Sequence, residues 1–105
     1  MSTQDTVYIG CNGHVSAVRI EDGVEVWRTK LDRSFFSVTG HEDVSVLVEG
    51  GRVYAGCHGH LFCLDARTGS LIWHNELSGL GHNEVTLAMP GQSVQFITRT
   101  EPSRE

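Results

Sequence analysis

Hydrophobic positions along the chain gather in short runs separated by turn residues, and they do not follow the 3.6-residue period of an amphipathic helix. The run over residues 53–57 ends at His58 and Gly59, a pair that fits a two-residue hairpin turn, and a second run begins at His60. A further turn over residues 67–69 leads into a third run. Short apolar and β-branched runs between glycine-rich turns are typical of antiparallel strands, so the pattern predicts an all-β chain.

A fourth strand is predicted ahead of these three. Residues 44–48 read Val-Ser-Val-Leu-Val and end at a turn formed by Gly50 and Gly51. Residues 44–77 therefore contain four strands that are joined in sequence by turns. Four antiparallel strands are the content of one propeller blade, so this segment predicts one blade.

The same pattern occurs twice. Residues 7–31 align with residues 53–77 at an offset of 46, and nine of the 25 positions are identical. The identities fall on glycines, aromatic residues and turn positions, among them Gly23 with Gly69 and Trp27 with Trp73. A period near 46 in a chain of strands indicates a propeller repeat.

These boundaries predict a single two-blade propeller unit over residues 1–105. The first repeat covers about 7–31 and the second about 44–77, while the polar tail covers 100–105. The first repeat lacks its opening strand. Residues 85–89 resemble 44–48 and are expected to supply it, from the same protomer or from the next one. The strand at 93–98 is then one too many and has no predicted place, and Phe35 and Phe36 of the linker are expected between the blades.

Residues 63–73 resemble the tryptophan-docking motif of quinoprotein dehydrogenase-like (PQQ-like) β-propeller repeats, which reads Ala-x-Asp-x-x-Thr-Gly-x-x-x-Trp. Cys63 replaces the alanine, and the rest of the motif is present. The first copy, residues 17–27, is looser, because Arg19 replaces the aspartate and Asp22 the threonine. The resemblance implies that blades dock through Trp27, Trp73, Gly23, Gly69, Thr68 and Asp65.

Two blades do not close a propeller, which typically has 4–8 blades. A repeat unit buries its faces only against neighbouring repeats. We therefore expect a homo-oligomeric ring, which has six blades as a trimer and eight as a tetramer. The tetramer is preferred, because the rings that the resemblance implies are often eight-bladed. The alternative is a fragment whose remaining blades are encoded elsewhere.

Charge and length narrow the class of partner. The formal net charge is −5 and lysines and arginines do not cluster, so a nucleic-acid partner is not expected. No apolar stretch reaches the length of a membrane span, and no membrane partner is expected. The first ten residues lack the features of a signal peptide. With three cysteines, an odd number, this predicts a cytoplasmic protein with reduced thiols.

Two cysteines and two histidines between Cys57 and Cys63 raise the question of a metal site. In a two-residue hairpin Cys57 and His60 flank the turn on one face, whereas strict alternation puts Cys63 on the other face. A tetrahedral zinc site needs converging ligands, so no metal is expected. The remaining metal candidates are two pairs at equivalent hairpin ends, Cys57 with His60 and Cys11 with His14.

The sequence predicts no catalytic residue and no cofactor. A thiolate–imidazole pair at Cys57 and His60 would need a third orienting residue, and none is visible. His41 and His74 are expected in loops or at a sheet edge, and His82 is the candidate rim or ligand residue because it could face a ring opening.

The leading hypothesis is a non-enzymatic scaffold or binding module with an unidentified protein or small-molecule partner. The alternative is a multivalent, lectin-like propeller that binds a sugar or another small ligand, which would require Trp27 and Trp73 to be exposed. A quinone-dependent dehydrogenase is suggested only by the resemblance. It is the least supported of the three.

Overall fold

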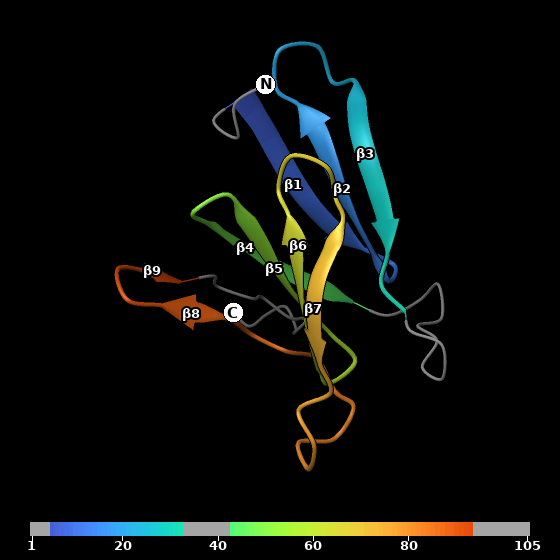
Figure 1. Ribbon diagram of the computed structural model, residues 1–105, viewed down its shortest axis with the longest axis vertical. Helices are drawn as coiled ribbons and strands as arrows, with labels where there is room; N and C mark the ends of the chain where they lie inside the picture. The colour runs from blue at the N-terminus through green and yellow to red at the C-terminus, as the bar shows by residue number, and fades with distance from the viewer. Residues whose placement is uncertain (1–4, 33–42, 94–105) are drawn as a thin grey trace, which may run out of the picture.

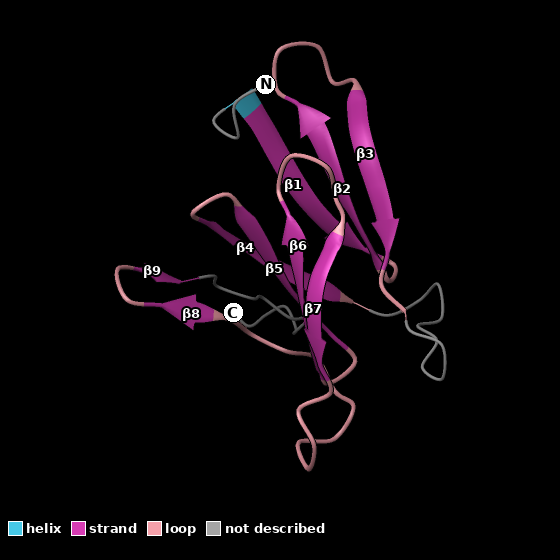
Figure 2. Cartoon of the chain, in the orientation of Figure 1, coloured by secondary structure: helices cyan, strands magenta, loops and turns pink. Residues whose placement is uncertain are grey.

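The computed structural model describes residues 5–32 and 43–93, which form two antiparallel sheets and a short hairpin (Figures 1 and 2). The first sheet contains β1 (Thr6–Cys11), β2 (His14–Arg19) and β3 (Glu25–Lys30) in that order. The second contains β4 (Val44–Glu49), β5 (Arg52–Cys57), β6 (His60–Asp65) and β7 (Leu71–Asn75). The hairpin pairs β8 (Ala88–Met89) with β9 (Gln92–Ser93). The predicted all-β fold with a four-stranded antiparallel blade is confirmed.

Two equivalent two-residue turns set the register of one hairpin in each sheet. Asn12 has a φ of 49° and His58 a φ of 54°, and each is followed by a glycine with positive φ. Two successive residues with positive φ form the type I′ turn, whose twist matches that of the flanking strands. Cys57 therefore lies opposite His60. The equivalent pair, Cys11 and His14, occupies the end of the first hairpin.

The hydrophobic core lies between the two sheets. The first sheet contributes Val15 and the residue that follows β3, Leu31, while the second contributes one face of β5 and β6. The buried residues on that face are Val53, Ala55, Cys57, Phe62 and Leu64. They alternate with residues of the opposite face, as strand geometry requires. Each sheet thus covers only one face of the other.

The hairpin β8–β9 follows a segment that packs against the opposite face of the second sheet, away from the first sheet (Figure 1). A Cβ added to Gly56 would lie 2.5 Å from Cγ1 of Val85, and one added to Gly10 would lie 2.8 Å from Cγ1 of Val44. Gly10 and Gly56 are equivalent in the repeat. Val85 thus contacts the second sheet as β4 contacts the first, and the Ser45 hydroxyl donates to its carbonyl.

In this chain the expected closing strand does not pair with β1. Ala88 and Met89 pair instead with Ser93 and Gln92, because the turn at 90–91 folds the chain back on itself. The first sheet has no counterpart of β4 among the described residues. Pairing of residues 85–89 with another copy stays a prediction. The expectations for Phe35, Phe36, His41 and residues 94–98 lie outside the described residues.

Candidate functional site

The contact between the two sheets centres on Trp27 of β3 and the turn that follows β6. The Trp27 indole N–H donates to the carbonyl of Ala66 at 3.0 Å, and the Thr29 hydroxyl donates to the carbonyl of Gly69 at 2.7 Å. Gly69 has a φ of +80°, and a Cβ there would lie 2.5 Å from Cε3 of Trp27. Only glycine fits both the backbone conformation and the indole ring.

Neighbouring side chains hold this turn in shape. The Tyr8 hydroxyl donates to the same Ala66 carbonyl at 3.2 Å, and its ring lies 6.1 Å from that of Trp27. Burial raises the pKa of Tyr8. The Asp65 carboxylate accepts hydrogen bonds from the backbone N–H groups of Arg67 and Thr68, at 2.8 and 3.3 Å. Asp65 therefore acts locally on the turn.

Gly23 and Trp73 are the residues equivalent to Gly69 and Trp27. They lie on different sheets and do not contact each other. Trp73 of β7 is 39% exposed and contacts Tyr54, with the ring centroids 6.2 Å apart. Gly23 has a φ of +76° and open space where a Cβ would be. Among the residues that the structure describes, Trp73 therefore does not dock on a second blade, and the lectin-like alternative gains an exposed indole.

In the turn that contains Gly23, an ion pair takes the place of the motif's aspartate and threonine. The Arg19 guanidinium donates two hydrogen bonds to the Asp22 carboxylate, at 2.9 and 2.7 Å. The hydrogen bond from Arg19 lowers the pKa of Asp22. Asp22 also accepts from the backbone N–H of Val24 at 3.1 Å. The turn is thus shaped by different residues but keeps its glycine.

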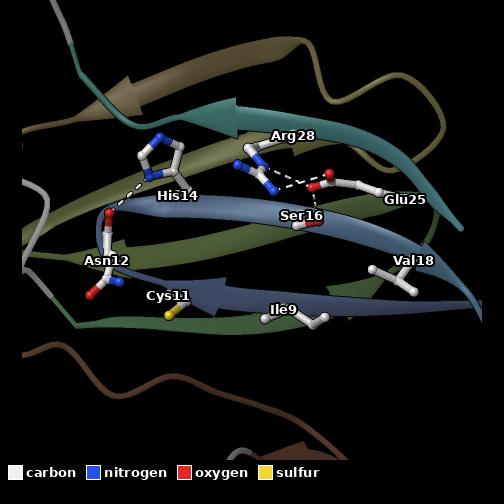
Figure 3. Close-up of a pocket in the computed structure, with 8 residues that line it drawn as sticks. All are labelled: Ile9, Cys11, Asn12, His14, Ser16, Val18, Glu25 and Arg28. Carbon is white, nitrogen blue, oxygen red and sulfur yellow. Dashed lines mark hydrogen bonds and ion pairs between the residues drawn. The ribbon is translucent and has the colours of Figure 1, made fainter. Parts of the chain in front are cut away.

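A hollow of about 550 Å³ lies on the open face of the first sheet (Figure 3). Its lining consists of Ile9, Cys11, Asn12, His14, Ser16, Val18, Glu25 and Arg28. The Ser16 hydroxyl donates to Glu25 at 2.6 Å, and Arg28 donates to the same carboxylate at 2.8 and 3.1 Å. These bonds, that from Arg28 first, lower the pKa of Glu25.

The metal candidates do not converge. Cys57 and His60 are buried cross-strand partners, Cys11 is exposed on the first sheet, and His14 is held by the Asn12 carbonyl at 2.8 Å. Cys63 lies opposite Tyr54, and burial raises the pKa of its thiol. Across residues 5–32 and 43–93, no group of three or more His, Cys, Asp or Glu side chains is arranged to hold a metal ion.

A group of four histidines gathers at one end of the second sheet, and sequence reasoning missed it. His60 and His74 are in contact, with Nδ1 and Nε2 2.8 Å apart, and the ring of His82 stacks on that of His58 at 4.9 Å. They come from a turn, two strands and a loop, so no sequence spacing marks them. The pairing of β6 with β7 was the available signal. Burial, with His74 as the next cause, lowers the pKa of His60 below 6.5.

The predicted rim residue His82 is exposed and lines a second hollow of about 360 Å³. His60 and Glu76 line it as well, together with the loop over residues 77–81.

The described part of the chain forms no helix long and apolar enough to cross a membrane.

Comparison with known proteins gives one family. A family model described as outer membrane protein assembly factor BamB matches residues 11–97. Chains of solved structures that match number 28, among them the crystal structure of BamB from Moraxella catarrhalis, at 24% identity and a TM-score of 0.50. That match covers 67% of this chain and 20% of the other, so this chain spans about a fifth of that protein and the likeness concerns the fold. No curated protein matches the chain.

Proposed function

The chain belongs to the PQQ-like repeat family of β-propeller proteins, and on this premise we propose that it is a non-enzymatic scaffold module that binds other proteins. The matching family model is described as an outer membrane protein assembly factor, and this description supports a protein-binding role. The observation that carries the proposal is that, among residues 5–32 and 43–93, one face of the first sheet is open and Trp73 is exposed on the far face of the second. We also propose a cytoplasmic location, which fractionation of cells that express the tagged chain tests.

Copies of the same chain supply the missing blades in this proposal. A head-to-tail contact between identical chains closes into a ring when the rotation per copy divides the circle. Three copies give a six-bladed ring and four give an eight-bladed one, and the tetramer is preferred. Residues 85–89 of one copy then provide the strand that precedes β1 of the next. In this arrangement β1 takes the place beside β8 that β9 holds in the single chain.

Light scattering behind a sizing column tests this proposal. The proposal predicts a mass three or four times the 11.6 kDa of the chain at micromolar concentration. A folded monomer at every concentration would contradict self-assembly. A soluble oligomer then serves as bait for protein partners in a cross-linked pull-down, with the monomeric variants described below as the matched control.

A small-ligand role is the second candidate, supported by the hollow of about 550 Å³ and by exposed Trp73. Aromatic side chains are common in the lining of small-ligand sites. A glycan array that gives binding abolished by Trp73→Ser would favour this role. No described residue supplies a specific observation for a quinone-dependent reaction, and an unchanged spectrum on quinone addition is the expected result.

A further inference from the structure

Equivalent positions in the two sheets differ sharply in burial. On the open face of the first sheet Val7, Ile9 and Ile20 are 46%, 40% and 58% exposed. Their equivalents in the second sheet, Val53, Ala55 and Ala66, are 0%, 0% and 2% exposed, because the first sheet and Trp27 cover them. The open face of the first sheet thus resembles the docked face of the second sheet, but none of the described residues forms a blade that covers it.

The far face of the second sheet has the complementary form. Trp73 and Tyr54 occupy the places of Trp27 and Tyr8, and each pair has nearly the same ring separation. Within residues 5–32 and 43–93, no hydrogen bond is made to the Trp73 indole N–H or to the Tyr54 hydroxyl. A large exposed aromatic side chain beside other apolar residues marks an interaction site.

We propose that Trp73 and Tyr54 of one copy dock on the Ile20–Gly23 turn of a second copy and repeat the contact within the chain. The Trp73 N–H then donates to the Ile20 carbonyl as Trp27 does to Ala66, and the indole ring covers Gly23 as Trp27 covers Gly69. The inference rests on the proposed ring and names its interface. It makes the ring a series of identical contacts, half of them within chains and half between them.

A second copy of the chain is the partner that fits both surfaces, the open face of the first sheet and the far face of the second. The two faces are the separated halves of a contact that the chain already forms once, so a copy brings the matching shape to each. The space beside Gly23 is empty, as the indole requires. Ser16, Glu25 and Arg28 lie on the open face of the first sheet and already bond with one another. This limits the cost of removing their polar groups from water when a second copy covers that face.

Two variants with opposite defects test the interface. Trp73→Ser removes the docking side chain, and Ile20→Asp places a charge on the docking face. Val7→Asp is a second variant of that face. Each alone is expected to be a folded monomer, with the dissociation constant raised roughly tenfold or more, the scale seen when a central aromatic contact is lost. Leu80→Ser, which changes a residue that is 73% exposed in the loop after β7, is the matched control and should keep the native mass.

Mixing the two variants gives the decisive result. A head-to-tail contact leaves one intact junction in the mixture, so Trp73→Ser and Ile20→Asp together should form a dimer that grows no further. If the parent chain is oligomeric but the variants keep its mass, or if the mixture stays monomeric, this docking contact is wrong while the ring survives. If the parent chain is itself a monomer, the proposed self-assembly fails first.

Discussion

At the scale of single residues, the docking contact joins side chains that the sequence places in different repeats. The motif at 63–73 contains the turn and its glycine, but the tryptophan in contact with Gly69 is Trp27, from the looser first copy. Trp73, in the better match to the motif, is exposed. The motif records the residue types that docking needs, whereas burial depends on which neighbouring blade is present.

Gly69 and Gly23 form a matched pair for mutation. Both have positive φ, so alanine costs about 1 kcal/mol of left-handed strain at either site. At Gly69 the added Cβ also meets Trp27, and such overpacking adds about 1–3 kcal/mol. We expect Gly69→Ala to reduce the unfolding free energy by about 2–4 kcal/mol and Gly23→Ala by about 1. Urea unfolding in the monomeric Ile20→Asp background measures both, and equal losses would count against the contact.

His60 makes stability depend on pH. Its pKa is lowered in the folded protein, chiefly by burial, so the unfolded chain takes up a proton near pH 6.5 while the folded chain takes it up only at lower pH. The contribution of His60 to stability is therefore intact above pH 6.5 and decreases as pH falls from there toward the lowered pKa. His60→Asn should flatten the loss of urea midpoint between pH 7.5 and 5 relative to the parent. His14→Asn, at the equivalent position of the first repeat, is the control, and an equal flattening there would refute the assignment.

At the scale of strands, much of the second sheet was predictable and its surroundings were not. The turn at His58 and Gly59 fixed the register of β5 with β6, including Cys57 opposite His60. The histidine group was missed because β6 and β7 shift register between Cys63 and Leu64, and because the loop with His82 folds back over the turn. A turn is determined by neighbouring residues, whereas the histidine group depends on segments that lie far apart in the sequence.

The segment at Val85 is expected to depend on the small size of Gly56. A methyl group at Gly56 would lie 2.5 Å from Cγ1 of Val85, so Gly56→Ala should detach the segment from the second sheet. Hydrogen exchange over residues 85–93 should then rise roughly tenfold, as local opening becomes easier, while β5 and β6 stay protected. Val85→Gly in the same chain makes room and should leave β5 and β6 unstrained. Unchanged exchange over 85–93 in Gly56→Ala would show that the segment is not held by this contact.

At the scale of the whole molecule, we propose that the chain forms one section of a ring. The described residues form three strands of one blade, four of the next and, at Val85, the start of a second contact between blades. The blade content followed from the 46-residue repeat, because each repeat carries its own turns and glycines. The number of copies does not follow from any residue, since a small change in the angle between blades separates six from eight.

Electron-microscopy class averages of the parent chain, viewed down the symmetry axis, test the closed ring most directly. We predict a closed disc with a central channel and six or eight equal blades, eight being preferred. The Trp73→Ser variant should give only small particles without a channel. Open arcs, stacked filaments or two-bladed wedges from the parent chain would contradict a ring that is built by copies of this chain.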